Sequence, residues 1–367
     1  MSESTYPSVN DLTLEERASL TSGGDAWHLQ GVEAKGIPGY MITDGPHGLR
    51  KSNSATTGEV DLNNCVPATC FPPAAGLSSS WNPELIHQVG EAMAEECIQE
   101  KVAVILGPGV NIKRNPLGGR CFAYWYEDPY LAGHEAIGIV AGVQSKGVGT
   151  SLKHFAANNQ ETDRLRISAN ISQRALREIY FPAFEHIVKE AQPWTIMCAY
   201  NCINGVHAAQ DHWLLTDVLR DEWGFQGIVM SDWGADHDRV ASLNAGLNLE
   251  MPPSYTDDQI VYAARDGRIQ PAQLDRMAQG MIDLVNKTRA AMSIENYRFD
   301  IEAHDEVAHQ AAIESMVLLK NDDAILPVAG DAKVTVIGEF ARTPRYQGGG
   351  SSHQRNWAGN SRQPKQG

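Results

Sequence analysis

The sequence predicts an α/β fold: a (β/α)8 TIM-type barrel followed by an incomplete start of an α/β sandwich domain. Short apolar segments alternate with longer amphipathic ones along most of the chain, which is typical of a parallel sheet with crossover helices. Repetition of this pattern over about 250 residues favours a closed barrel over an open, doubly wound sheet. A later apolar segment, residues 334–338, predicts the first strand of a second sheet.

Local signals predict the elements in order along the chain. Residues 13–16 (TLEE) form a capping box, so a first helix should run through Leu20. Strands are predicted at residues 40–42, 102–106, 150–152, 195–199 and 228–230. Helices are predicted at residues 85–99, 131–144, 172–191, 213–223, 274–292 and 302–320.

This pattern divides the chain into four parts. Residues 1–293 form the barrel, 294–320 a linking helical region, 321–353 the beginning of the sandwich domain, and 354–367 a disordered tail. The tail is basic, has no acidic residue and is almost without apolar residues beyond Trp357, a composition that cannot form a core.

Composition excludes several classes of function. The 367-residue chain has a formal charge of −15, which argues against a protein that follows nucleic-acid phosphates. No apolar run has the length of a membrane span, and the N-terminus lacks the pattern of a secretion signal. Six cysteines without paired zinc spacing indicate mostly reduced thiols in a cytoplasmic protein, with local pairing of Cys65 and Cys70 left open. The oligomeric state is also open, a homo-oligomer included.

Polar residues follow the predicted strands where each strand ends. They are Asp44, Lys153, His154, Tyr200, Asp232 and Glu250. Because the strand ends of a barrel converge on one face, we expect these side chains to form one site. Asp232 has a second interpretation of similar weight, as the N-cap of a helix through Arg239 and Leu243.

Five motifs, in this order, resemble glycoside hydrolase family 3, the β-glucosidase group. They are residues 43–50 (TDGPHGLR), 119–120 (GR), 127–129 (EDP), 153–155 (KHF) and 231–233 (SDW), and the likeness extends from the Thr13 region to about His353. The resemblance implies retaining removal of terminal β-D-glucosyl residues from a small β-glucoside or short oligosaccharide, without a cofactor. It implies Asp232 as the nucleophile, Trp233 as an apolar wall, and a sugar held by Asp44, Arg120, Lys153, His154 and Tyr200.

The residue types suit this chemistry. Retaining hydrolysis uses two carboxyl groups about 5 Å apart, one to attack and one to protonate the leaving oxygen. Lys153 and Arg120 are expected to lower the pKa of Asp232 and keep it ionised. The structural alternatives are a turn cap for Asp44, an ion pair with Glu127 or Asp128 for Arg120, solvent for Lys153, a core position for His154 and a loop brace for Arg50.

A metal-dependent barrel hydrolase is a rival hypothesis. Asp232, Asp236, His237 and Asp238 offer carboxylate and imidazole groups that suit a divalent ion. Against it, no His-x-His or His-carboxylate pair follows an early strand. Loss of activity in EDTA would support the metal.

The chain departs from the family pattern in two places. Ala123 stands where the family usually has a glutamate, which leaves the cations Arg120 and Lys153 with one partner fewer unless Glu127 replaces it. The second departure is the acid/base glutamate, which the family's β-glucosidases carry on the sandwich domain.

Only the start of that sandwich domain is predicted here, so a frameshift, a premature stop or a split sequence is expected. Glu161 and Asp163 are the substitute acids that the sequence suggests. A second functional hypothesis is therefore a sugar-binding barrel with crippled turnover.

Overall fold

Five parallel strands form the centre of the molecule in the computed structural model, which describes residues 6–53 and 64–357. They are β1 (Met41–Asp44), β2 (Val102–Leu106), β3 (Gly149–Phe155), β5 (Thr195–Cys198) and β8 (Ile228–Met230). They lie in the order β1-β2-β3-β5-β8, and each neighbouring pair is parallel. The five strands predicted for the barrel are confirmed.

Single bridges close this sheet into a ring. They join Met230 to Leu249, Glu250 to Ser22, and His28 to Met41 of β1. The ring therefore returns to its first strand through irregular segments near residues 22–28 and 247–250. The predicted TIM-type barrel is confirmed, with an irregular closure that the sequence pattern did not indicate.

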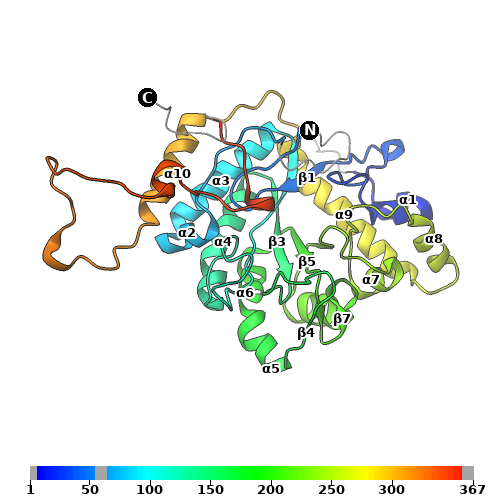
Figure 1. The fold of residues 1–367 in the computed structure, drawn as a ribbon. Helices are drawn as coiled ribbons and strands as arrows, with labels where there is room; N and C mark the ends of the chain where they lie inside the picture. The colour runs from blue at the N-terminus through cyan, green and yellow to red at the C-terminus, as the bar shows by residue number, and fades with distance from the viewer. Residues whose placement is uncertain (1–5, 54–63, 358–367) are drawn as a thin grey trace.

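Helices surround the barrel (Figure 1). They include α1 (Leu14–Leu20), α3 (Pro83–Gln99), α4 (Pro129–Ser145), α6 (Pro182–Ala191), η7 (Trp213–Glu222), α7 (Arg239–Ala245), α8 (Asp257–Arg265) and α9 (Pro271–Met292). The capping box of α1 forms as predicted, because Glu16 N donates to Thr13 Oγ1 at 3.2 Å and Thr13 N donates to Glu16 Oε2 at 2.8 Å. Where α3 meets α4, a Cβ on Gly142 would collide with the carbonyl oxygen of His87, so glycine permits the close approach.

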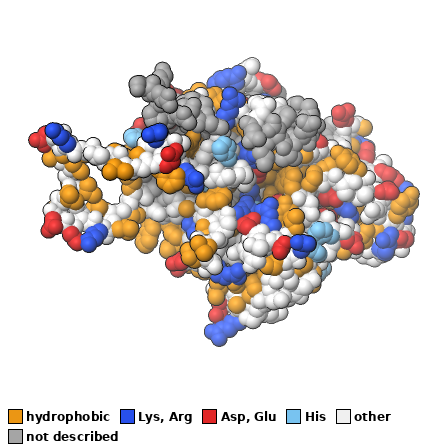
Figure 2. Space-filling model, viewed as in Figure 1, with side chains coloured by type: hydrophobic (Ala, Val, Ile, Leu, Met, Phe, Trp, Pro, Cys, Tyr) orange, Lys and Arg blue, Asp and Glu red, His pale blue; other side chains and the backbone are white. Residues whose placement is uncertain are grey.

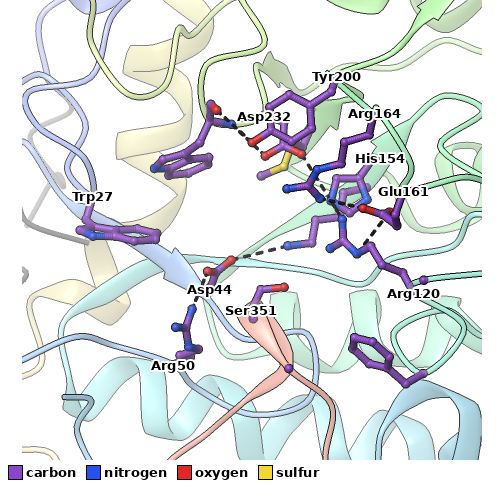
Figure 3. Close-up of a pocket in the computed structure, with 17 residues that line it drawn as sticks. Trp27, Asp44, Arg50, Arg120, His154, Glu161, Arg164, Tyr200, Asp232 and Ser351 are labelled. Atoms are coloured by element: carbon purple, nitrogen blue, oxygen red, sulfur yellow. Dashed lines mark hydrogen bonds and ion pairs between the residues drawn. The ribbon is translucent and has the colours of Figure 1, made fainter. Parts of the chain in front are cut away.

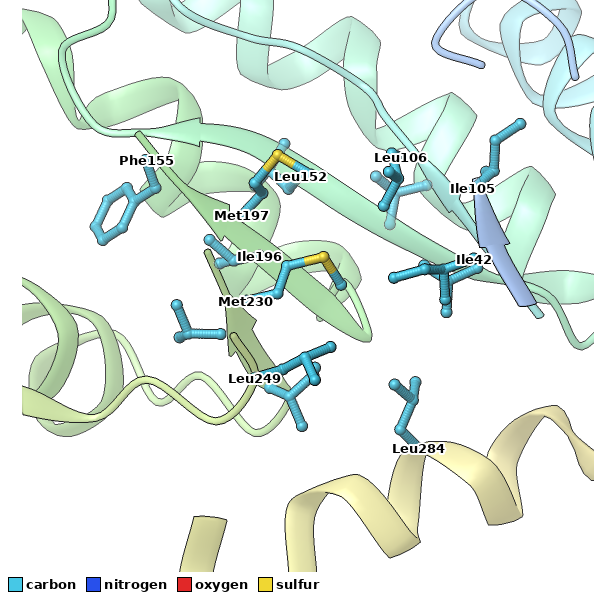
Figure 4. Packing of buried hydrophobic residues seen from close by; sticks show 14 of the residues in the cluster. Ile42, Ile105, Leu106, Leu152, Phe155, Ile196, Met197, Met230, Leu249 and Leu284 are labelled. Carbon is cyan, nitrogen blue, oxygen red and sulfur yellow. The ribbon is translucent and has the colours of Figure 1, made fainter. Parts of the chain in front are cut away.

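Large apolar side chains fill the space between the strands and α9 (Figure 4). Every residue of β2 is buried. Ile42, Leu152, Met197 and Leu249 come from other parts of the ring, and all are at most 1% exposed. Branched and long apolar side chains of this kind pack the interior of such barrels, so the cavity described below lies above a solid core.

Two local departures from the predicted elements shape the loops after β3 and β5. The helix predicted at residues 172–191 is divided into α5 (Gln173–Ala175), η5 (Leu176–Tyr180) and α6, because Pro182 has no N–H to continue the hydrogen-bond ladder. An unpredicted small sheet has the order β4-β6-β7, with β4 Ser168–Ala169, β6 Cys202–Ile203 and β7 Val206–His207. It joins the loop after β3 to the loop after β5.

Beyond α10 (Ile301–Glu314), the chain leaves the barrel as an arm, residues 316–346 (Figure 1). Figure 2 shows apolar side chains along this projecting segment. Val334, Val336 and Ile337 are 69%, 72% and 88% exposed, and residues 334–338 form no strand. The strand prediction is wrong here because no neighbouring strand pairs with this backbone within the described residues, and an isolated apolar segment does not form a sheet. The helix predicted to reach residue 320 also ends early, with α10.

Residues 347–357 return to the barrel. Gln354 is buried, and the backbone of Arg355 forms an isolated β-bridge with that of Pro67. The ring centroids of Trp357 and Phe299 lie 5.6 Å apart. These contacts order residues 354–357, which the sequence predicts to be disordered; the rest of that predicted tail, residues 358–367, lies outside the described residues. No helix in the described part of the chain is long and apolar enough to cross a membrane.

Candidate active site

A cavity of about 550 Å³ lies at the carboxyl ends of the barrel strands (Figure 3). Asp44 ends β1, Lys153 and His154 lie near the end of β3, and Asp232 follows β8. The seven residues that the family resemblance assigns to the site all line the cavity: Asp44, Arg120, Lys153, His154, Tyr200, Asp232 and Trp233. Segments far apart in the sequence thus place these side chains around one space.

Asp44 contacts two cations at the edge of the cavity. Arg50 Nη1 donates to Asp44 Oδ2 at 3.0 Å, and Lys153 Nζ lies 3.7 Å from Asp44 Oδ1. Lys153 is 3% exposed, so its interpretation as a solvated lysine is wrong. Burial lowers the pKa of Lys153, while the Asp44 charge opposes this effect. Arg50 braces its own loop, as predicted from the sequence, and also lines the cavity.

Asp232 does not cap the following helix. Asp238 does so, because its Oδ1 accepts from Val240 N and Ala241 N at 3.0 Å each. Asp232 Oδ1 accepts from Trp233 N at 2.8 Å, and its Oδ2 lies 3.6 Å from His154 Nε2. The capping interpretation of Asp232 is therefore wrong, and its carboxylate faces the cavity.

The pKa of Asp232 is shifted in the direction opposite to the one expected from its neighbours. Burial raises the pKa of this carboxyl, and the charges of Lys153 and Arg120 lower it without reversing the shift. The sequence identified the two cations correctly but gave no measure of burial. At 8% exposure, the loss of hydration disfavours the ionised form more than the cations favour it.

His154 is a buried histidine whose two ring nitrogens both have partners. The Tyr124 hydroxyl lies 3.0 Å from Nδ1, and Arg120 Nη1 lies 3.2 Å from Nε2. Burial, together with the charges of Arg120, Lys153 and Arg164, holds the pKa of His154 well below its usual range. The imidazole is therefore neutral, which makes it a poor donor of a catalytic proton.

Aromatic residues form one wall of the cavity. Trp27 and Trp233 have ring centroids 5.3 Å apart, and Trp233 Nε1 donates to Ala26 O at 2.9 Å. The Tyr200 hydroxyl donates to Trp233 O at 2.9 Å, and the Arg164 guanidinium lies 4.7 Å from the Tyr200 ring. This wall offers an apolar face beside the charged groups, an arrangement suited to a sugar ring.

Arg120 has a carboxylate partner that the sequence analysis did not assign to it. Glu161 Oε1 lies 3.8 Å from Arg120 Nε, whereas Glu127 is exposed. Asp128 instead caps α4, its Oδ1 accepting from Leu131 N at 2.9 Å. Glu161 thus supplies a negative charge beside Arg120.

Sequence reasoning missed several residues of the cavity. Trp27, Phe122, Arg164, Met197 and Ser351 line it. Met197 lies in β5, and the others come from loops or from the segment that returns after the arm. The run Gly348-Gly349-Gly350-Ser351 was the one local signal for part of this set, since glycine lets a backbone approach a ligand closely.

Glu250 does not join the site, although it follows a barrel segment. Its Oε2 accepts from Arg239 Nη1 at 2.9 Å and from Ser254 N at 3.1 Å. Arg239 is 5% exposed and needs a nearby negative charge. The prediction that Glu250 meets the other strand-end residues is therefore wrong.

The ligand set of the rival metal hypothesis is not assembled. Asp236 Oδ1 accepts from Ser242 Oγ at 2.7 Å, Asp238 caps α7, and the His237 ring packs 4.2 Å from the His207 ring. Among the residues that the structure describes, no group of three or more His, Cys, Asp or Glu is arranged to hold a metal ion.

Comparison with known proteins identifies the barrel. The family model described as the glycosyl hydrolase family 3 N terminal domain matches residues 52–284. An exo-alpha-(1->6)-L-arabinopyranosidase of Bifidobacterium breve is 86% identical over 96% of this chain and 48% of its own length. The chain thus spans about half the length of the curated relatives that it matches.

Solved structures agree with this comparison. A crystal structure of a Bifidobacterium adolescentis GH3 beta-glucosidase has 89% sequence identity and a TM-score of 0.89, over 94% of this chain and 49% of that chain. A structure of beta-glucosidase 3B from Thermotoga neapolitana in complex with alpha-D-glucose has 38% identity and a TM-score of 0.86, over 95% of this chain and 52% of that one.

Proposed function

The chain belongs to glycosyl hydrolase family 3, and from this premise we propose that its barrel binds the non-reducing end of a β-D-glucoside and attacks it with Asp232. The observation that carries the proposal is the cavity, where Asp232 faces the same space as Asp44, Lys153 and Arg120. Carboxylate and ammonium groups of this kind can accept from and donate to sugar hydroxyls.

In the proposed reaction, Asp232 Oδ2 attacks the anomeric carbon as the bond to the leaving oxygen breaks. A glycosyl ester forms on Asp232, and water then cleaves it with overall retention of configuration. The burial that raises the pKa of Asp232 also removes water from its carboxylate, and Lys153 and Arg120 offset part of the cost of its charge.

The second carboxyl group of such a reaction has no clear candidate among the described residues. Asp44 is engaged by Arg50 and Lys153, and Glu161 accepts from Arg164 Nη1 at 2.9 Å. Asp163 is exposed, pairs with Arg166 at 2.8 Å and does not line the cavity.

The alternatives for this chain are therefore two functions: a working β-glucosidase, or a sugar-binding barrel with impaired turnover. General acid catalysis contributes about 10²–10⁴-fold, so the two outcomes differ measurably. This chain spans about half the length of its curated relatives, so we propose their activity for it and do not take that activity as established.

Leaving-group dependence distinguishes these outcomes. The phenolate of 2,4-dinitrophenyl β-D-glucoside leaves without protonation, whereas the leaving group of cellobiose needs a proton. We expect the ratio of the cleavage rates on these two substrates to be at least ~100-fold higher for this chain than for an enzyme with an intact general acid. Azide should accelerate turnover, because it attacks the glycosyl ester without a general base. The Asp232→Asn variant is the control and should be inactive on both substrates.

Equal use of both substrates and no effect of azide would show that an acid/base group is present. Cleavage of the matching α-L-arabinopyranoside in preference to the glucoside would replace the sugar assignment, as the name of the B. breve relative suggests. We expect EDTA to leave the activity unchanged. Loss of activity in EDTA would support the metal hypothesis instead.

We also propose the cytoplasm as the site of action and a division of the chain into residues 1–293, 294–320, 321–353 and 354–367. Buried thiols such as Cys97 and Cys198, which are not in disulfide bonds, support a reducing compartment. Mass spectrometry of alkylated protein isolated from the producing cell would test the redox state.

A further inference from the structure

Among the described residues, Glu161 is one of three carboxylates that line the cavity, beside Asp44 and Asp232. Arg164 Nη1 donates to its Oε2 at 2.9 Å, and Arg120 Nε lies 3.8 Å from its Oε1. Figure 3 shows Glu161 beside both guanidinium groups. One carboxylate thus holds two of the cations that face the cavity.

A closed ring of contacts connects Glu161 with His154. Asn158 Nδ2 donates both to Glu161 Oε1 at 3.2 Å and to the Tyr124 hydroxyl at 2.9 Å. That hydroxyl lies 3.0 Å from His154 Nδ1, and Arg120 Nη1 lies 3.2 Å from His154 Nε2. Both ring nitrogens of His154 are therefore held by groups that lead back to Glu161.

The donors in this ring determine which nitrogen of His154 carries the proton. A guanidinium only donates hydrogen bonds, so Nε2 must accept from Arg120. The proton of the neutral imidazole then lies on Nδ1 and is donated to the Tyr124 hydroxyl oxygen. In this tautomer Nε2, which is 3.6 Å from Asp232 Oδ2, has no proton to donate to that carboxylate.

We propose that Glu161 is a positioning residue: it holds Arg120 against Nε2 of His154 and thereby keeps His154 from donating a hydrogen bond to Asp232. A hydrogen bond to a carboxylate stabilises its charged form and weakens it as a nucleophile. Without Glu161, Arg120 is released, the proton of His154 can move to Nε2, and His154 becomes a donor to Asp232. This role rests on the proposed function, in which Asp232 attacks the sugar.

The same loop supplies a matched control. Asp163 and Arg166 form an ion pair of 2.8 Å, but both side chains are exposed and neither lines the cavity. Asp163→Asn therefore removes an ion pair as short as that of Glu161 with Arg164 and leaves the ring of contacts intact. Glu161→Asp keeps the charge, and Glu161→Gln keeps the shape but removes the charge.

Nitrogen-15 NMR of the full chain labelled at histidine tests the tautomer without a ligand. The His154 signals are assigned by their loss in His154→Asn. We expect a protonated Nδ1 and an unprotonated Nε2 in the wild type, in Glu161→Asp and in Asp163→Asn, and protonation of Nε2 in Glu161→Gln. A wild-type His154 protonated at Nε2 overturns the proposal even where a variant does not fold, and so does a folded Glu161→Gln with wild-type signals.

Calorimetric titration with glucose separates failure of this proposal from failure of the proposed function. A wild type that binds neither glucose nor L-arabinose contradicts the proposed function, while the NMR result still decides the role of Glu161. Where the wild type binds glucose, Glu161→Gln should weaken the affinity by about tenfold, because Arg120 and Arg164 lose the carboxylate that holds them. Asp163→Asn should bind as the wild type does, and equal affinities of Glu161→Gln and the wild type count against the proposal.

Discussion

Two apolar segments of the same length behave in opposite ways in this molecule. Val102–Leu106 forms β2, with every residue buried between β1 and β3. Residues 334–338 (VTVIG) contain four β-branched residues against three in β2, yet they form no strand and lie on the exposed arm. Ile105 is 1% exposed and Ile337 is 88% exposed.

The difference lies in the neighbours and not in the segments. β2 has a parallel strand on each side, so its backbone groups are paired and its side chains meet those of other strands. The arm offers residues 334–338 no such partner within the described residues. An apolar, β-branched segment therefore predicts a strand only where the rest of the chain supplies the sheet.

The largest expected effect separates the two segments by stability. Ile105→Ala should lower the free energy of unfolding by about 2–5 kcal/mol, because it removes buried methyl groups and leaves a cavity. Ile337→Ala should change it by less than about 0.5 kcal/mol, because the side chain is already in water. Urea unfolding followed by circular dichroism measures both. Similar losses for the two variants would mean that the arm is packed in solution.

A smaller effect is expected at the junction of barrel and arm. His304 of α10 lies 3.0 Å from Glu96 Oε1 and 3.3 Å from Glu95 Oε2 of α3. Burial works to lower the pKa of His304, but the two carboxylates outweigh it and the pKa is raised. His304→Gln should destabilise the attachment of α10 by about 1–3 kcal/mol, the usual effect of breaking a buried hydrogen bond to a charged group.

The sign of the pH dependence follows from the raised pKa. The stabilisation by His304 is fully present below its unfolded pKa of about 6.5 and is lost as the pH rises through the higher folded value. Hydrogen exchange of α10, corrected for intrinsic rates, should therefore show less protection at pH 9 than at pH 6. The His304→Gln variant should lack this difference, and a wild type with equal protection at both pH values would contradict the assignment.

The smallest effect on stability is expected from charges placed on the arm. Leu319 is 91% exposed, so the double substitution Leu319→Lys and Ile337→Lys should leave the free energy of unfolding within about 0.5 kcal/mol. It should reduce self-association, because exposed apolar patches promote aggregation. Light scattering against protein concentration measures this. A double variant that aggregates as the wild type does would show that another surface is responsible.

Local signals were sufficient for much of the fold. The capping box of α1 and the prolines that begin α3, α4 and α9 act within one turn of chain, so they are readable without a structure. A continuous apolar run identified β2, because a strand that is buried on both faces has apolar residues at every position. The irregular closure of the barrel depends on contacts between segments far apart in the sequence, and no local pattern marked it.

The candidate site was predictable to the extent that it lies at strand ends. Asp44 and Asp232 follow buried strands, so the barrel geometry brings them to one face. Arg164 and Trp27 lie on loops whose course is set by the small sheet and by the bridge from His28 to Met41. Glu250 has the same sequence context as Asp232 but turns to the buried Arg239, a choice that depends on charge pairing in the folded chain.

Covalent trapping tests the central claim, that Asp232 attacks the sugar, most directly. In 2,4-dinitrophenyl 2-deoxy-2-fluoro-β-D-glucoside, the fluorine slows both steps, while the leaving group restores the first one without an acid. We predict that the intact protein gains the mass of one fluoroglucosyl group, that peptide mapping locates it on Asp232, and that Asp232→Asn gains nothing. No adduct on the folded wild type, or an adduct on another residue such as Glu161, would contradict this account.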